Sequence, residues 1–226
     1  MELEKVVPFG RSLDEYRHMF ALSDQDLNKT IIGVADGPAS FNAEMSSLGK
    51  SVVSVDPLYI FSAEAIENQF NVVVDNIIDQ VRATPNDWVW TYHQSPDHLK
   101  ANRVNVLNRF VADFDKAKHE GRYIVGELPA PGFAEQSFEL ALCSHFLFLY
   151  SDHLSYDFHR DSILAMARIA REVRIFPLLT LALNVSPYVP SLIEEFTSMG
   201  YEMSVEKVPY ELQRGGNEML RIRKSS

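Results

Sequence analysis

Four short polar segments of the sequence each follow an apolar, strand-like run and carry residues that could bind a ligand. They are Asp36-Gly37-Pro38, Asp56-Pro57, Glu127-Leu128 and Ser144-His145. In an open parallel sheet, ligands bind outside the carboxyl ends of the strands, where the strand order reverses. We therefore expect the four segments to meet at one site.

Asp56 is the candidate for binding a nucleoside. It follows the apolar run 51–55 and lies about 20 residues beyond Gly37, the spacing at which a carboxylate accepts hydrogen bonds from both ribose hydroxyls in Rossmann-type folds. The alternative is that Asp56-Pro57 only turns the chain. The spacing favours the ribose.

The loop around Asp36 disfavours a dinucleotide. Residues 33–39 read Gly-Val-Ala-Asp-Gly-Pro-Ala, whereas a pyrophosphate site requires Gly-x-Gly-x-x-Gly for close approach of the backbone. Asp36 also puts negative charge in the region where a phosphate would lie. A ligand with an amino group is compatible with this carboxylate. The alternative is a plain helix-start turn, with Asp36 as its cap and Pro38 in the first turn.

His145 is the candidate catalytic base. The unperturbed pKa of histidine, near 6.5, suits removal of a proton from an oxygen or nitrogen nucleophile. Because aromatic and aliphatic residues follow it directly, a packed and hydrogen-bonded histidine is the alternative. Asp152 and His153 come next, either at the mouth of the site or in solvent.

Strand-like and helix-like segments alternate along the chain, as in α/β proteins. The expected strands are 30–34, 51–55, 122–125, 138–144, 173–176 and a terminal hairpin of 201–208 with 219–223. Helical spacing occurs at 12–22, 39–48, 157–171 and 187–199, and over most of 62–118. The continuous apolar strands predict a doubly wound, mostly parallel seven-stranded sheet with a C-terminal antiparallel hairpin. Basic residues alternate along the last strand and predict a solvated edge, namely Arg221, Arg223 and Lys224.

The composition narrows the class of protein. The chain has 226 residues, 46% hydrophobic and 23% charged, which fits one folded domain. Asp and Glu number 31 against 21 Lys and Arg, so binding to duplex nucleic acid or an anionic membrane is disfavoured. Cys143 is the single cysteine, which excludes an intrachain disulfide and cysteine-based metal sites and fits a reducing cytoplasm. With no signal-peptide pattern and no apolar run of about 20 residues, we expect a cytoplasmic protein.

The motifs together resemble those of the class I S-adenosylmethionine-dependent methyltransferases, over residues 30–176. Segment 33–39 is similar to that family's acid-x-Gly-x-Gly-x-Gly loop, and 52–56 to its second strand ending in an acidic residue. Residues 126–128, Gly-Glu-Leu, match the third motif, and 137–145 match the fourth strand. The resemblance implies a Rossmann-like methyltransferase fold.

The first loop departs from the family pattern. Gly33 stands where the family has an acid, and Ala35 and Ala39 replace two of its glycines, so that Gly37 alone is kept. Asp36 is expected to compensate in part for the missing acid.

The resemblance implies S-adenosylmethionine as the cofactor, no metal, and His145 as the catalytic residue. The residues it implies for cofactor binding are Tyr16, Ala35, Asp36, Gly37, Pro38, Asp56, Pro57, Leu58, Glu127, Leu128 and Ser144. It also implies a helical N-terminal lid, about 1–28, and a helical insertion, about 62–118, in a single domain. In that insertion four residues either shape an acceptor pocket or anchor its helices, namely Trp88, Trp90, Tyr92 and His93.

The acceptor is not specified by the sequence. Ser144-His145-Phe146-Leu147 replaces the Asn/Asp-Pro-Pro-aromatic motif of enzymes that methylate the amino groups of bases, which argues against that subgroup without naming another. A small molecule is expected as the acceptor rather than nucleic acid. One alternative is a non-catalytic protein of this fold that binds the cofactor or has lost it, as the altered loop indicates. Another is an NAD(P)-dependent oxidoreductase, which Asp36 and the missing glycines disfavour. A hydrolase would need Gly-x-Ser-x-Gly, which is absent.

Overall fold

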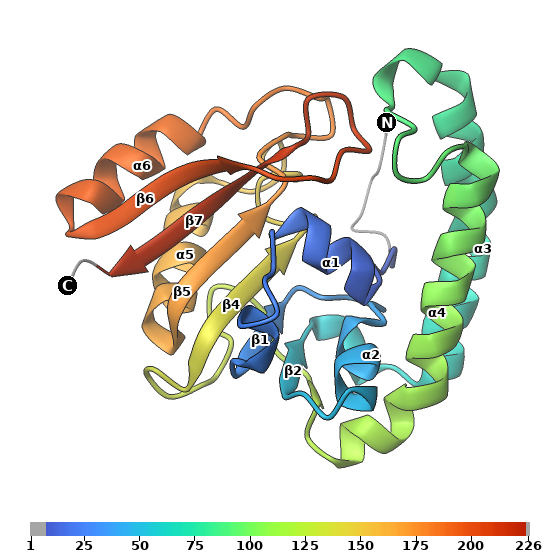
Figure 1. Cartoon of the computed structure of the whole chain (residues 1–226), viewed down its shortest axis with the longest axis horizontal. Coiled ribbons are helices and arrows are strands. Elements are labelled where there is room, and N and C mark those ends of the chain that lie inside the picture. Colours follow the sequence, from blue (N-terminus) through green and yellow to red (C-terminus); the bar gives the residue numbers. More distant parts are fainter. Residues whose placement is uncertain (1–7, 225–226) are drawn as a thin grey trace.

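A seven-stranded sheet forms the centre of the computed structural model, which describes residues 8–224 (Figure 1). Its order is β3-β2-β1-β4-β5-β7-β6. The strands are β1 Ile31–Val34, β2 Val52–Val55, β3 Tyr123–Ile124, β4 Phe138–Ser144, β5 Ala170–Phe176, β6 Tyr201–Lys207 and β7 Glu218–Lys224. The strands from β3 to β5 are parallel, whereas β7 runs antiparallel to both β5 and β6. The expected fold class is confirmed.

Residues 8–224 form six α-helices and three short 3₁₀ helices. The α-helices are α1 Leu13–Met19, α2 Phe41–Ser47, α3 Ala63–Ala83, α4 Pro96–His119, α5 Tyr156–Ile169 and α6 Val189–Ser198. The 3₁₀ helices are η1 Asp26–Asn28, η2 Pro57–Ile60 and η3 Pro85–Asp87. The predicted helical stretch between the second and third strands is the long pair α3 and α4, which stand side by side in Figure 1.

The sheet is covered on both faces, so its strands are buried on both sides. Leu140 and Leu142 of β4 join a core with α1, α2, α3 and α4. Ala141 and Cys143, the residues between and after them, join a second core with α5 and α6. This alternation explains why β4 reads as a continuous apolar run rather than an alternating one.

Two sequence predictions differ from the structure. The helix expected over 157–171 ends at Ile169, because Ala170 takes extended backbone angles and starts β5 without a loop. The solvated edge expected at the last strand is wrong, because β7 lies between β5 and β6. There Arg221 Nε donates to Glu172 Oε1 at 2.8 Å and Arg223 Nε donates to Glu172 Oε2 at 2.9 Å.

Across residues 8–224, no helix combines the length and apolar character needed to cross a membrane.

Candidate active site

A cavity of about 410 Å³ lies at the carboxyl ends of β1, β2 and β4. The strand order reverses here, since β1 pairs with both β2 and β4. Ligands of open α/β sheets bind at this switch point, and the volume falls in the usual range for small-molecule pockets, about 300–1,000 Å³. The cavity is lined by all twelve residues that the sequence singled out: Tyr16, Ala35, Asp36, Gly37, Pro38, Asp56, Pro57, Leu58, Glu127, Leu128, Ser144 and His145.

The loop after β1 turns sharply through two left-handed residues. Ala35 has φ 55° and Gly37 has φ 54°. Gly37 adopts this conformation without strain, whereas the Cβ of Ala35 makes it unfavourable by about 1 kcal/mol. Ala35 therefore keeps the backbone geometry that a glycine would favour at this position.

The Asp36 carboxylate folds back over Gly33. A Cβ placed on Gly33 would lie 2.1 Å from Asp36 Oδ2, so the Asp36 carboxylate occupies the space of a side chain at residue 33. Asp36 accepts hydrogen bonds from the Tyr16 hydroxyl and, at 2.6 Å, from Ser54 Oγ. Gly33 is thus required by the position of Asp36.

Burial raises the pKa of Asp36 to about 6, against an ordinary value of 3.8, although the bonds from Ser54 and Tyr16 oppose the shift. The nearby Asp56 carboxylate adds to the increase. The group is mostly ionised at neutral pH and loses its charge in mildly acidic solution. A positively charged ligand group beside it would favour the ionised form.

Asp56 joins the loops after β1 and β2. Its Oδ2 accepts from the Gly37 N–H and its Oδ1 accepts from the Leu58 N–H, both at 2.8 Å. It therefore caps η2, as the chain-turning alternative required. Each carboxylate oxygen can accept a second hydrogen bond, so these contacts are compatible with a ribose. Burial also raises the pKa of Asp56.

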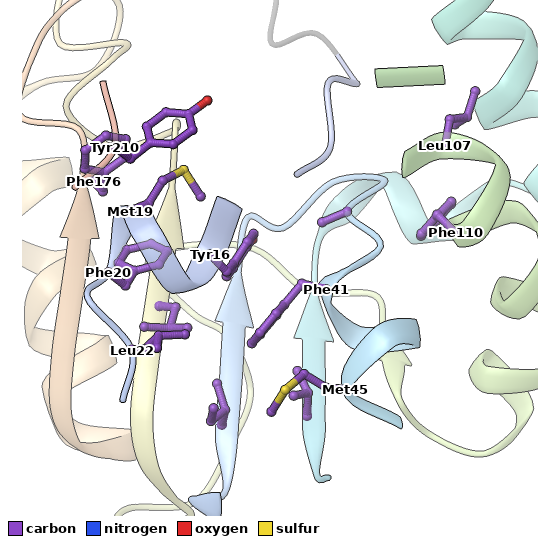
Figure 2. Packing of buried hydrophobic residues seen from close by; sticks show 14 of the residues in the cluster. Tyr16, Met19, Phe20, Leu22, Phe41, Met45, Leu107, Phe110, Phe176 and Tyr210 are labelled. Atoms are coloured by element: carbon purple, nitrogen blue, oxygen red, sulfur yellow. The ribbon is translucent and has the colours of Figure 1, made fainter. Parts of the chain in front are cut away.

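Tyr16 brings α1 to the cavity. Its ring stacks on Phe41 of α2, with centroids 4.2 Å apart and planes at 8° (Figure 2). Burial raises the pKa of Tyr16 well above its usual value, so the hydroxyl keeps its proton and donates it to Asp36. The predicted lid covers about residues 1–28, of which 1–7 lie outside the described residues. Within the described part, residues 8–28, α1 and the residue after it pack into the core through Tyr16, Met19 and Phe20.

His145 lies at the end of β4 and has φ 51°. Its backbone N–H donates to the Phe176 carbonyl oxygen at 2.7 Å, and its ring Nδ1 lies 2.9 Å from Ser144 Oγ. Burial lowers the pKa of His145 well below its usual value, and the charges of Arg11 and Arg103 lower it further. The ring is therefore neutral, and it is packed while also lining the cavity. Its role as a catalytic base stays a prediction.

A second cavity of about 90 Å³ adjoins the first, and both are lined by Phe9, Arg11 and His145. Trp88 lines the second cavity, whereas His93 is buried in the core beside Tyr210. Asp152 and His153 are exposed and line neither cavity. In the described part of the chain, no group of three or more His, Cys, Asp or Glu side chains is placed to hold a metal ion.

Sequence reasoning missed the arginines of these cavities. Arg103 comes from the middle of α4 and meets α1 only in the folded chain. Arg11 had a local signal in the preceding Gly10, since a Cβ there would lie 2.0 Å from the Pro38 carbonyl oxygen. Gly10 therefore lets the segment before α1 lie against the loop after β1.

Comparison with known proteins gives one close match in sequence. No protein-family model matches the chain. Uncharacterized protein MJ0045 of Methanocaldococcus jannaschii is 32% identical over 225 residues, which span 99% of each chain. The chain belongs to the family of MJ0045.

A solved structure with a TM-score of 0.50 shows the same fold. Magnesium protoporphyrin IX methyltransferase of Synechocystis PCC 6803, with bound SAM, has a TM-score of 0.50 and 12% identity, covering 94% of this chain and 78% of that one. The same enzyme with bound SAH has a TM-score of 0.49 and 12% identity, covering 94% and 82%. The MJ0045-family chain therefore has the class I methyltransferase fold.

Proposed function

We propose that this chain is an S-adenosylmethionine-dependent methyltransferase that acts on a small molecule. The observation that carries the proposal is the cavity at the switch point, where the loop 35–38, Asp36 and Asp56 meet. The magnesium protoporphyrin IX methyltransferase, which has this fold, was solved with bound SAM. Fold alone does not assign a function, so the proposal depends on the chemistry of the residues in the cavity.

The lining residues fit the cofactor in charge and size. Asp56 would accept hydrogen bonds from the ribose hydroxyls, as carboxylates at this position do in Rossmann-type sites. Asp36 would attract the amino group, because a buried ionised carboxylate favours a nearby cation. The buried Asp36 carboxylate also disfavours the diphosphate of NADH or NADPH.

When bound, S-adenosylmethionine supplies an electrophilic methyl group, which the acceptor's lone pair takes while the sulfur keeps the electrons of the broken bond. The protein's task is to position the acceptor and to exclude water. His145 would accept the proton that the acceptor loses. For its Nε2 to do so, Nδ1 must carry the ring hydrogen and donate to Ser144 Oγ.

A second candidate is a protein that binds the cofactor without transferring its methyl group. The lowered pKa of His145 favours it, because a weaker base removes a proton less readily. Both candidates require the same binding site. They differ only in whether the methyl group of S-adenosylmethionine, followed by an isotopic label, is transferred to a small molecule.

A thermal melt tests the shared binding site. The protein is heated alone and with S-adenosylmethionine, S-adenosylhomocysteine, NADH or NADPH. A ligand at about 100 times its Kd adds about 2.7 kcal/mol, which raises Tm by roughly 5–10 °C for a chain of this size. We expect this rise with the adenosyl ligands only. A rise with NADH or NADPH alone would support an oxidoreductase, and no rise with any ligand would overturn the proposal.

A further inference from the structure

The second cavity has apolar walls and two arginines. Its apolar lining consists of Phe9, Ile77, Val81, Trp88, Leu99, Leu149, Leu181 and Leu212. Arg11 and Arg103 line it as well, and His145 lines both this cavity and the larger one. Its volume, about 90 Å³, holds roughly three water molecules or a short carbon chain with one polar group.

The arginines belong to a buried cluster with an excess of positive charge. Arg103 donates to both oxygens of Glu15, at 2.8 and 2.7 Å, and both side chains are fully buried. Arg11 Nε lies 4.0 Å from the same carboxylate. Burial lowers the pKa of His93 and raises the pKa of Tyr210, so both of these neighbours are neutral. Two guanidinium groups thus share one carboxylate.

Both arginines have an unused donor. Arg11 Nε and Arg103 Nε are buried and have no hydrogen-bond partner among residues 8–224. Arg11 is 9% exposed and Arg103 is 1% exposed. Buried polar groups of proteins are nearly always hydrogen-bonded, and an unpaired one is unfavourable. The two buried Nε–H groups therefore leave the cluster with more hydrogen-bond donors than acceptors.

We propose that the second cavity binds a carboxylate of the methyl acceptor, held by Arg11 and Arg103. A monoanion balances the single excess positive charge, whereas a phosphate dianion would exceed it. Guanidinium groups suit the planar geometry of a carboxylate, and the apolar walls suit a short carbon skeleton. His145 would then face the reacting end of the acceptor at the boundary between the cavities. The role as acceptor site rests on the proposed function, but binding of the anion does not.

Trp88 allows binding to be measured without catalysis. The chain has two tryptophans, and Trp88 lines the second cavity. Butyrate is the probe, and butyramide, its neutral isostere, is the control. Each is titrated while tryptophan fluorescence is recorded, with sodium chloride keeping the ionic strength constant. We expect saturable quenching by butyrate with a Kd in the millimolar range, and at least tenfold weaker binding of butyramide.

Two variants and one control locate the effect. Arg11→Gln removes one charge and one Nε–H, and Arg103→Lys keeps the charge beside Glu15 but removes the Nε–H. Each is expected to weaken butyrate binding at least fivefold. Arg168→Gln is the matched control, because Arg168 is exposed and lines neither cavity.

The outcomes separate this proposal from the proposed function. Equal binding of butyrate and butyramide by the natural chain, or no binding of either, would overturn the anion site whether or not the variants fold. S-adenosylhomocysteine binding is measured in parallel, and Arg103→Lys is expected to change it less than twofold. If Arg103→Lys weakens the binding of S-adenosylhomocysteine but not the binding of butyrate, the arginine serves the cofactor site and the proposal is wrong. Butyrate binding without S-adenosylhomocysteine binding would keep the anion site and reject the methyltransferase.

Discussion

Asp36 is the residue at which stability and the proposed function oppose each other. The residue is 6% exposed, and burial raises its pKa to about 6. Because this exceeds the value of an unfolded aspartate, the folded chain binds an extra proton between about pH 4 and pH 6, and its stability falls as pH rises through this window. Above pH 6, the ionised carboxylate lowers the free energy of unfolding by about 3 kcal/mol.

Asp36→Asn is therefore expected to stabilise the protein and weaken cofactor binding. Removing the buried charge should add about 1–3 kcal/mol to the free energy of unfolding at pH 7.5, measured by urea denaturation. Because the variant lacks the carboxylate proposed to pair with the ligand's amino group, it should bind S-adenosylhomocysteine at least fivefold more weakly. In the unchanged protein, the same affinity should fall as pH drops below 6, because Asp36 becomes protonated. The matched control is Asp152→Asn, which changes an exposed carboxylate. A loss of stability in Asp36→Asn, or an unchanged affinity of that variant for S-adenosylhomocysteine, would contradict this account.

At the scale of the elements, Glu15 links α1 to α4. It caps the start of α1 with Ser12 and pairs with Arg103 of α4. It also accepts from the Tyr210 hydroxyl at 3.1 Å, which connects the segment before β7. This one carboxylate therefore fixes three parts of the wall around both cavities.

Glu15→Gln is expected to destabilise the protein by about 3–5 kcal/mol, because it leaves Arg103 charged and buried without its counter-ion. Urea denaturation gives the change in the free energy of unfolding. Glu135→Gln is the control, since Glu135 is exposed in the loop before β4, and it should change stability by less than 0.5 kcal/mol. A loss below 1 kcal/mol in Glu15→Gln would show that the pair does not hold α1 in place.

Elements with local signals could be predicted from the sequence, and those that depend on distant contacts could not. β1 and β2 were marked by buried β-branched runs that end in aspartate and turn residues, and Asp36 and Asp56 followed from them. The place of β7 inside the sheet has no local signal, because it depends on pairing with β5 and β6. Arg103 was missed for the same reason, since its partner Glu15 lies 88 residues away.

At the scale of the whole molecule, the reversal of strand order creates the site. From β3 at the edge the chain returns to β4 on the other side of β1, so the loops after β1 and β4 diverge and leave the 410 Å³ cavity. The cores on both faces hold the sheet rigid, while α1 and the α3–α4 pair add walls that the strands alone would lack. The central claim is that this cavity binds an adenosyl ligand and that Asp56 accepts hydrogen bonds from its ribose.

Calorimetric titration of S-adenosylhomocysteine tests that claim most directly, in the natural chain, Asp56→Asn and the exposed control Asp152→Asn. We predict one binding site in the natural chain and in Asp152→Asn, and at least tenfold weaker binding in Asp56→Asn, or about 1.4 kcal/mol. Retained folding of Asp56→Asn is checked by its melt. Equal affinity in all three proteins, or no binding at millimolar ligand in the natural chain, would contradict the account.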